Sequence, residues 1–128
     1  MIELIIKSRK KFEFIDITKQ IKEQIGEVSR GLVTLFVPHT TAGIVITRSD
    51  ELAQADIQKR LGELVPNYIQ YENPDGFSEA IIKSIIVGID KRILIINGKL
   101  ALGIMQRIYF CEFNGPQRRK IYMKIIKG

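Results

Sequence analysis

A short loop between two β-rich segments holds the first residues that could do chemistry. In Pro38-His39-Thr40-Thr41-Ala42-Gly43 the only imidazole of the chain, His39, precedes the hydroxyls of Thr40 and Thr41. The glycine that closes the loop lets a ligand approach the backbone, so the loop can hold an anion. The alternation of the preceding strand turns His39 toward its apolar side. The structural alternative is therefore a half-buried histidine bonded to a carbonyl.

A second group of polar residues lies in the long β-rich segment from Leu100 to Phe113. Its even-numbered positions are apolar except for Gln106 and Glu112, which therefore share one face with large apolar side chains. A buried carboxylate is costly unless it is paired, and a buried amide must be hydrogen-bonded. Both residues should have specific partners in a site or an interface. The alternative for Glu112 is a structural ion pair with an arginine such as Arg118 or Arg119.

The third candidate is the basic turn Gly115-Pro116-Gln117-Arg118-Arg119-Lys120. An arginine at this turn can grip a phosphate through two parallel hydrogen bonds. Because neighbouring side chains of an extended chain point to opposite sides, at most one of Arg118 and Arg119 should join a given pocket. The alternative is a solvated basic turn.

Length and composition limit the class of protein. The chain has 128 residues, which suit a single domain spanning 1–128, and its 45% hydrophobic content allows a real core. No apolar run approaches the roughly 20 residues of a membrane helix, so we expect a soluble protein with no membrane partner. The first residues lack a secretory signal pattern, which favours a cytoplasmic location. The single cysteine, Cys111, excludes an internal disulfide framework and a cysteine-based zinc cluster.

The net charge of the chain indicates which classes of molecule it could bind. A net charge of +6 favours anions such as phosphorylated metabolites or nucleic acid. Many of the cations lie near the two termini. A solvated edge strand would also be rich in cations, so these residues need not bind an anion. No aromatic-basic strand motif or recognition helix is present, so a nucleic-acid partner is not expected. The heavy use of Ile, Lys and Glu is typical of a heat-adapted host, a thermophile.

The elements that must position these residues follow from apolar periodicity and from turn and cap residues. Thr18 and Asp50 (or Ser49) are expected to cap helices, and Asn97-Gly98 to form a hairpin turn. The strands are expected at residues 2–7, 12–17, 31–38, 43–47, 93–96, 100–113 and 120–126, and the helices at 18–29, 50–65 and 77–87.

The order of these elements predicts the fold class. Helices do not alternate singly with strands, so we expect an α+β fold in which a mixed or antiparallel β-sheet sandwich carries its helices on one side. The third helix has one apolar row at Phe77, Ile81 and Ile85, with Ile82 and Ile86 beside it. We expect this helix to be mostly buried, with Gly88 as its C-cap.

Three stretches of the chain resemble, in order and spacing, the signature stretches of the YjbQ family. They are Phe36 to Gly43, Leu100 to Tyr109 and Glu112 to Arg119, and the likeness covers essentially the whole chain. The resemblance implies a YjbQ-like α+β subunit that assembles as a homotrimer, with its site near subunit boundaries. It also implies a weak thiamine-phosphate synthase activity, which joins a pyrimidine diphosphate to a thiazole phosphate with loss of diphosphate.

The sequence departs from the family at two histidines. Family members resemble one another in three histidines that together look like a metal site. Here the first is His39, but Asn73 and Ile81 stand in the places of the other two. Isoleucine cannot bind a metal and asparagine offers only a weak oxygen donor. A zinc site of three imidazoles is therefore excluded, and we expect no resident metal.

Two hypotheses of function follow from these patterns. The first is a YjbQ-like protein that binds a phosphorylated small molecule through His39, Thr40, Thr41, Gln106, Glu112 and Arg118 or Arg119. If it is catalytic, cations would neutralise a leaving diphosphate while His39 moves a proton or donates a hydrogen bond. Mg²⁺ carried in with the diphosphate would find oxygens on Glu72, Asp75 and Glu79. The second hypothesis is a non-catalytic trimeric binding or scaffold protein that kept the fold and lost the metal.

Overall fold

Antiparallel pairing joins the strands of this chain into two sheets. The computed structural model describes residues 1–128. The strands are β1 Ile2–Lys7, β2 Glu13–Asp16, β3 Gly31–Phe36, β4 Ala42–Arg48, β5 Asp90–Ile96, β6 Lys99–Leu100, β7 Gln106–Glu112 and β8 Arg118–Lys127; the helices are α1 Thr18–Ile25, α2 Glu51–Leu64 and α3 Ser78–Val87. The larger sheet has the order β1-β8-β3-β5-β6 and the smaller sheet the order β2-β7-β4, with every pair antiparallel.

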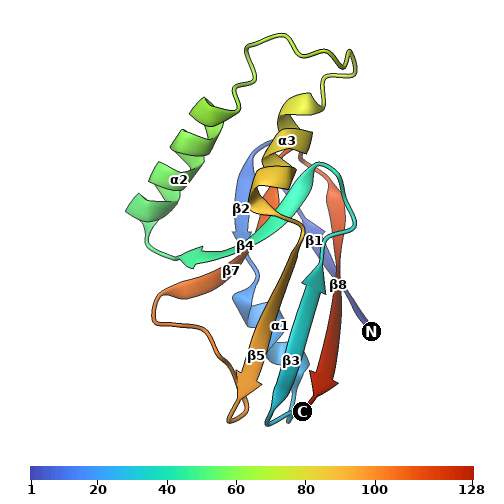
Figure 1. Cartoon of the computed structure of the whole chain (residues 1–128), viewed down its shortest axis with the longest axis vertical. Helices are drawn as coiled ribbons and strands as arrows, with labels where there is room; N and C mark the ends of the chain where they lie inside the picture. Colours follow the sequence, from blue (N-terminus) through green and yellow to red (C-terminus); the bar gives the residue numbers. More distant parts are fainter.

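The two sheets enclose the main core between them. Leu35 and Met123 of the larger sheet pack in one buried cluster with Ile44 and Phe110 of the smaller sheet, and α1 adds Ile21. Helices α2 and α3 lie together at one end of the molecule, where residues 65–77 connect them (Figure 1). None of the three helices combines the length and apolar character needed to cross a membrane. The expected α+β class with antiparallel sheets is confirmed.

Short polar and glycine signals set several of the element boundaries. The Asp50 carboxylate accepts a hydrogen bond from the Ala53 N–H and so caps α2, as predicted. Asn97 and Gly98 both have positive φ, at 52° and 74°, and they join β5 to β6 in the expected hairpin. Gly88, at φ 90°, ends α3. These signals act over a few residues, which is why the sequence reveals them.

Two predicted elements were wrong in their extent. The segment 100–113 is not one strand, because it breaks after Leu100 and β7 begins only at Gln106, following Met105 at a φ of 70°. The first helix ends at Ile25 rather than near residue 29, because Gly26 leaves the helical conformation. Thr18 does not cap that helix. Its hydroxyl instead accepts a hydrogen bond from the backbone N–H of Ile108 on β7, 2.8 Å away.

The third helix is less buried than predicted. Its apolar row faces outward: Ile82, Ile85 and Ile86 are all exposed. The face that packs inward carries Lys83 and Ser84 among its buried residues. The helix contacts β4 of the smaller sheet. Its isoleucines therefore form part of the outer surface of the subunit.

Candidate functional site

A buried ion pair connects the two sheets beneath the His39 loop. Glu112, at the end of β7, has 0% of its surface exposed, and Arg119, at the start of β8, has 4%. The Arg119 Nε lies 2.8 Å from Glu112 Oε1 and its Nη2 lies 2.5 Å from Oε2, so the pair is bidentate. The ion pair named as the alternative reading of Glu112 is therefore present, with Arg119 as the partner.

Further hydrogen bonds complete the coordination of this carboxylate. The Ser8 hydroxyl donates to Glu112 Oε1 at 2.7 Å, and the backbone N–H of Asn114 donates to Oε2 at 3.0 Å. Burial would raise the pKa of Glu112, but the hydrogen bonds from Arg119 and Ser8 outweigh it and hold that pKa below its usual value. Glu112 is therefore an ionised, fully satisfied structural group.

Thr41 belongs to the same network. Arg119 Nη2 donates to the Thr41 hydroxyl at 2.8 Å and to its carbonyl at 3.3 Å. That carbonyl also accepts from the backbone N–H of Phe113. The side chain and the carbonyl of Thr41 thus hold the arginine in place.

His39 is half-buried and accepts a hydrogen bond from the backbone. Its Nε2 lies 3.0 Å from the N–H of Lys120, so this nitrogen must carry a lone pair and Nδ1 carries the proton of the neutral ring. Burial lowers the pKa of His39 below its ordinary 6.5, and the positive charge of Arg119 lowers it further. The partner is an amide donor, not the carbonyl acceptor that the structural alternative named.

An open hollow of about 480 Å³ lies over this network. It is lined by residues 36–41 together with Ile89 and Arg119. Thr40 is exposed, and its carbonyl accepts from the Ser84 hydroxyl on α3 at 2.8 Å. The backbone N–H groups of His39, Thr40 and Thr41 have no acceptor within the chain. Three consecutive amides in the lining of the hollow thus have no hydrogen-bond partner within the chain.

Two of the predicted site residues lie elsewhere. Gln106 is opposite Arg48 at the far end of β7 from Glu112. Its side chain is exposed, and its Oε1 accepts from the backbone N–H of Gly103 at 2.7 Å. Arg118 is exposed and lies opposite Lys7. The structure therefore brings together His39, Thr40, Thr41, Glu112 and Arg119, and it leaves out Gln106 and Arg118.

The acidic residues proposed for magnesium are dispersed or already paired. Both oxygens of Glu79 are occupied, one by the Lys83 ammonium at 2.6 Å and the other by that of Lys11 at 3.2 Å. Asp75 accepts from the backbone N–H of Phe77, and Glu72 is exposed. No group of three His, Cys, Asp or Glu side chains gathers closely enough to hold a metal ion.

Sequence reasoning missed two residues of these clusters. Ser8 sits in a basic turn, and nothing in its neighbourhood indicates that its hydroxyl reaches Glu112 across more than 100 residues of sequence. Lys83 was also missed. A lysine amid the four isoleucines of α3 was the available signal, because a charged side chain in an apolar row needs a specific partner.

Comparisons with known proteins all find similarity to one protein family, along nearly the whole chain. The family model described as UPF0047 protein YjbQ-like matches residues 2–128. A UPF0047 protein of Methanocaldococcus jannaschii is 44% identical over 124 residues, which cover 94% of this chain and 90% of that protein. The UPF0047 protein YugU of Bacillus subtilis is 37% identical, covering 94% of this chain and 95% of its own.

Solved structures give the same result for the fold. An uncharacterised YjbQ/UPF0047 family protein of Clostridium acetobutylicum matches with a TM-score of 0.94 and 43% identity, covering 98% of this chain and all of that one. A conserved hypothetical protein of Thermus thermophilus matches with a TM-score of 0.90 and 30% identity over 98% of this chain and all of its own.

Proposed function

Because the chain belongs to the YjbQ-like UPF0047 family, whose function is uncharacterised, we propose that it binds a phosphorylated small molecule in the hollow beside His39. The binding groups are the hydroxyl of Thr40, Nδ1–H of His39 and the backbone N–H groups of residues 39–41. The protein would act in the cytoplasm, with small molecules and copies of itself as partners rather than membranes or nucleic acid.

The observation that carries this proposal is the set of unpaired amides. Nearly all buried backbone N–H groups in proteins have a partner in the chain, in water or in a ligand. Thr41 is buried, yet neither its amide nor those of the two preceding residues meets an acceptor in the chain. Adjacent amides bind phosphate oxygens in many proteins. Glu112 already neutralises Arg119, so the guanidinium serves to hold the loop and not to grip the phosphate directly.

Residue-resolved NMR tests the binding proposal with inorganic phosphate and diphosphate as probes. We expect saturable shifts of the amide resonances of His39, Thr40 and Thr41 as either anion is added. The amide of Gly103, which already donates to Gln106, is the internal control and should not move. The proposal fails if the three loop amides stay in place at millimolar concentrations of both anions.

The enzymatic form of the proposal is the transferase reaction that the family resemblance implies. A thiazole-phosphate nitrogen would attack the methylene carbon of a pyrimidine diphosphate, forming a C–N bond while the bond to the diphosphate oxygen breaks. The loop amides would stabilise the charge that develops on the leaving diphosphate. Neutral His39 would donate a hydrogen bond from Nδ1, because Nε2 is occupied by Lys120. Any Mg²⁺ would arrive with the diphosphate, since Glu79 is paired with two lysines.

An assay with metal-free protein separates the enzymatic form from binding alone. The protein is incubated with the pyrimidine diphosphate and the thiazole phosphate, with and without added Mg²⁺. Thiamine phosphate above a no-enzyme control supports catalysis. Its absence in both conditions, alongside shifts of the loop amides, would leave a binding protein without this activity.

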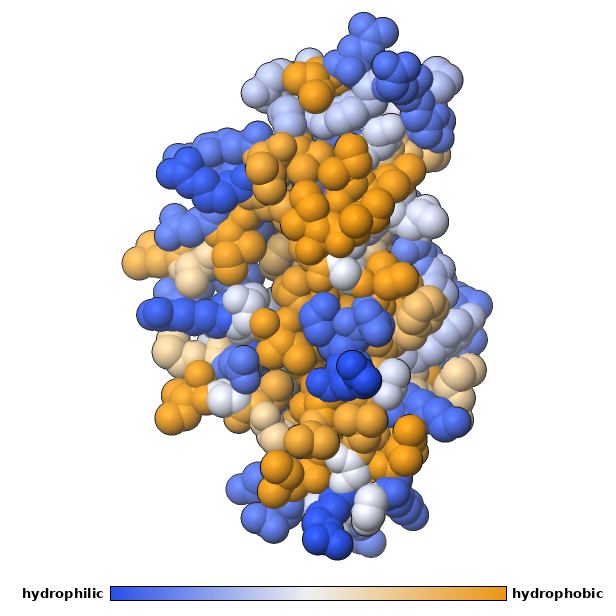
Figure 2. All heavy atoms as spheres, in the orientation of Figure 1, coloured by the Kyte–Doolittle hydropathy of each residue, from blue (hydrophilic) through white to orange (hydrophobic).

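The second candidate function is a non-catalytic trimeric binding or scaffold protein. An apolar surface favours it; this surface extends from α3 over the outer side of the larger sheet and is interrupted by a hydrophilic cluster at its centre (Figure 2). We call this surface the apolar face; its exposed members are Phe36, Ile82, Ile85, Ile86, Leu94 and Ile96. Monomeric proteins rarely expose so many large apolar side chains together, and such patches mark interfaces. We propose that copies of the chain cover this face in a homotrimer.

A further inference from the structure

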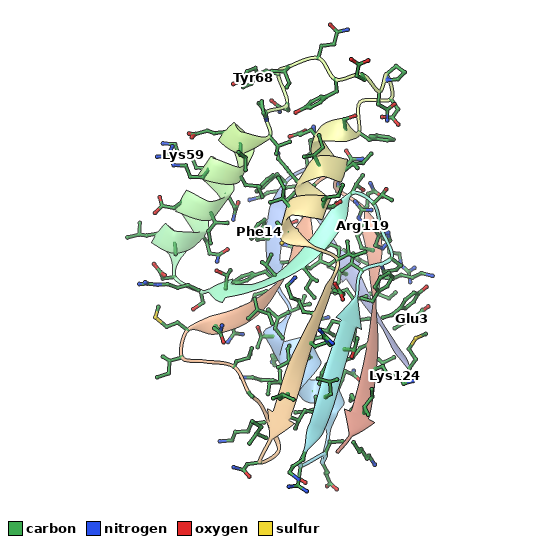
Figure 3. All side chains as sticks on the ribbon, viewed as in Figure 1. Glu3, Phe14, Lys59, Tyr68, Arg119 and Lys124 are labelled. Carbon is green, nitrogen blue, oxygen red and sulfur yellow. The ribbon has the colours of Figure 1, made fainter.

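A second hollow, of about 430 Å³, lies between α2, α3 and the turn that precedes β2. Its size is within the range of small-molecule pockets. It shares no lining residue with the hollow beside His39. In Figure 3, Lys59 on α2 and Arg119 on β8 lie on opposite sides of α3, in agreement with the separate linings of the two hollows. The residues important to its chemistry are Lys11, Phe12, Lys59, Glu79, Lys83 and Phe113.

The buried lysine of α3 is the central group of this hollow. Lys83 has 3% of its surface exposed, and its ammonium lies 2.6 Å from Glu79 Oε2 and 4.8 Å from the centre of the Phe12 ring. A lysine ammonium has three donors, and Glu79 is its only hydrogen-bond acceptor in the chain. Glu79 compensates the charge of Lys83, and the remaining donors of the ammonium can meet a further acceptor in the hollow.

The charges around the hollow do not balance. Lys11, whose side chain is 53% exposed, shares the Glu79 carboxylate with the buried Lys83, and the exposed Lys59 adds a third cation at the wall. The lining therefore carries three cations and one carboxylate. Burial would raise the pKa of Glu79, but hydrogen bonds from Lys83 and Lys11 outweigh it and hold that pKa below its usual value. Glu79 is thus ionised at neutral pH and cannot supply another negative charge. An anion from outside the chain would complete the balance.

The apolar part of the hollow indicates the rest of the ligand. The rings of Phe12 and Phe113 meet edge to face, with centroids 5.5 Å apart. They line the same hollow as the lysines, so a ligand can place a planar ring against them while its anionic group meets the ammonium groups. We propose that this hollow, the Lys83 pocket, binds a small anionic molecule that carries a planar ring, with its phosphate or carboxylate beside Lys83 and Lys11.

The experiment uses four probes in titrations followed by NMR and calorimetry. Phenyl phosphate and benzoate carry both an anion and a ring, inorganic phosphate carries only the charge, and benzyl alcohol only the ring. We expect phenyl phosphate and benzoate to bind most tightly and to shift the resonances of Phe12, Lys83 and Phe113. Binding of inorganic phosphate as tightly as phenyl phosphate, or shifts confined to other residues, would overturn the proposal.

Two variants test the pocket, one at its buried lysine and one at an exposed lysine of its wall. Lys83→Gln removes the central ammonium, and we expect at least tenfold weaker binding of phenyl phosphate, about the value of one charge-assisted hydrogen bond. Lys59→Glu reverses an exposed charge at the wall without touching the core, so it tests the charge requirement even if Lys83→Gln fails to fold. It should weaken binding several-fold. Lys19→Glu, an exposed change on α1, is the matched control. Equal affinity of Lys59→Glu and Lys19→Glu would contradict the pocket.

The His39 hollow provides the remaining control. His39→Gln should leave the affinity of the Lys83 pocket for benzoate within about twofold, because the two hollows have separate linings. If His39→Gln and Lys59→Glu weaken benzoate binding equally, the ligand occupies the first hollow and the Lys83 pocket is not a site. Failure of the loop amides to respond to phosphate has no bearing on this result.

Discussion

Glu112 forms the buried ion pair that links the two sheets. It receives two hydrogen bonds from Arg119, which belongs to the other sheet, and one from Ser8. If the carboxylate is removed, the Arg119 guanidinium stays buried without a counter-charge, and this costs more than the lost hydrogen bonds alone.

We predict that Glu112→Gln lowers the free energy of unfolding by about 3–5 kcal/mol, measured by denaturant titration. Glu3→Gln is the matched control, since Glu3 forms only a loose, exposed contact with Lys120 at 3.9 Å, and its effect should stay within about 0.5 kcal/mol. Equal stabilities of the two variants would show that the buried pair contributes nothing to folding.

His39 gives a pH dependence that can be isolated because it is the only histidine. Its pKa in the folded protein lies below 6.5, so the unfolded chain takes up a proton first as the pH falls. Stability from the neutral ring is therefore complete above pH 6.5 and is lost as the pH falls through the folded pKa. We expect an NMR titration of the ring protons to give a midpoint below 6.5.

The variant His39→Gln tests how the free energy of unfolding depends on pH. The amide oxygen of glutamine can still accept from Lys120 N–H, but it does not titrate. The free energy of unfolding of the variant should change less between pH 7 and pH 5 than that of the natural protein. Parallel pH curves for the two proteins would refute the assignment of His39 as neutral in the fold.

Sequence reasoning reached part of the site because it relied on face alternation. Alternation correctly predicted that only one of Arg118 and Arg119 would turn inward, and that Glu112 would be buried with a partner. It did not reveal which hydroxyl or amide completes the network, since these come from residues far apart in the chain. Gln106 shares the parity of Glu112, but it lies at the other end of β7 and is exposed.

At the scale of elements, the position of α3 depends on a glycine in β4. A Cβ on Gly43 would lie 2.4 Å from Val87 Cγ2 and 2.6 Å from the carbonyl oxygen of Gly88. The carbonyl belongs to the backbone, and the N–H of Ile44 donates to it at 3.0 Å, so it cannot yield without cost. The helix therefore packs on the strand only because this position has no side chain.

We predict that Gly43→Ala lowers the free energy of unfolding by about 1–3 kcal/mol through overpacking. Gly62→Ala is the opposite case, because a Cβ there meets nothing within 4 Å and the residue lies inside α2. That change should raise stability by about 0.5–1 kcal/mol. Thermal or denaturant unfolding measures both, and a stable Gly43→Ala protein would mean that α3 can move away from β4 freely.

The elements themselves were predictable where local residues decide them. The cap of α2, the Asn97-Gly98 hairpin and the end of α3 all depend on side chains within a few residues of the boundary. The break between Leu100 and β7 was not visible, because the intervening residues keep an apolar alternation. The apolar row of α3 also misled the prediction of burial, since periodicity gives a face but does not say whether the subunit itself covers it.

For the whole molecule, the family and the fold class could be predicted from the sequence, whereas the residues exposed on the outer surface could not. The three matched stretches identify a family whose model covers residues 2–128. Whether the outer surface of the subunit is buried depends on other molecules that contact it, and the sequence of one chain does not describe them. The exposed isoleucines of α3 and the outer apolar residues of β5 lie on one face of the molecule in Figure 2, with a hydrophilic cluster between them. We propose that copies of the chain cover this surface.

The variant Ile85→Glu tests that association. Ile85 is 74% exposed in the subunit, so a glutamate there should leave the fold intact, yet it would place a charge inside the proposed trimer contact. By light scattering we expect the natural protein at three times the chain mass of 14.7 kDa, and Ile85→Glu at the monomer mass. Leu52→Glu on α2, 79% exposed and outside the apolar face, should remain trimeric. A monomeric natural protein, or a trimeric Ile85→Glu, would show that copies of the chain do not cover this face.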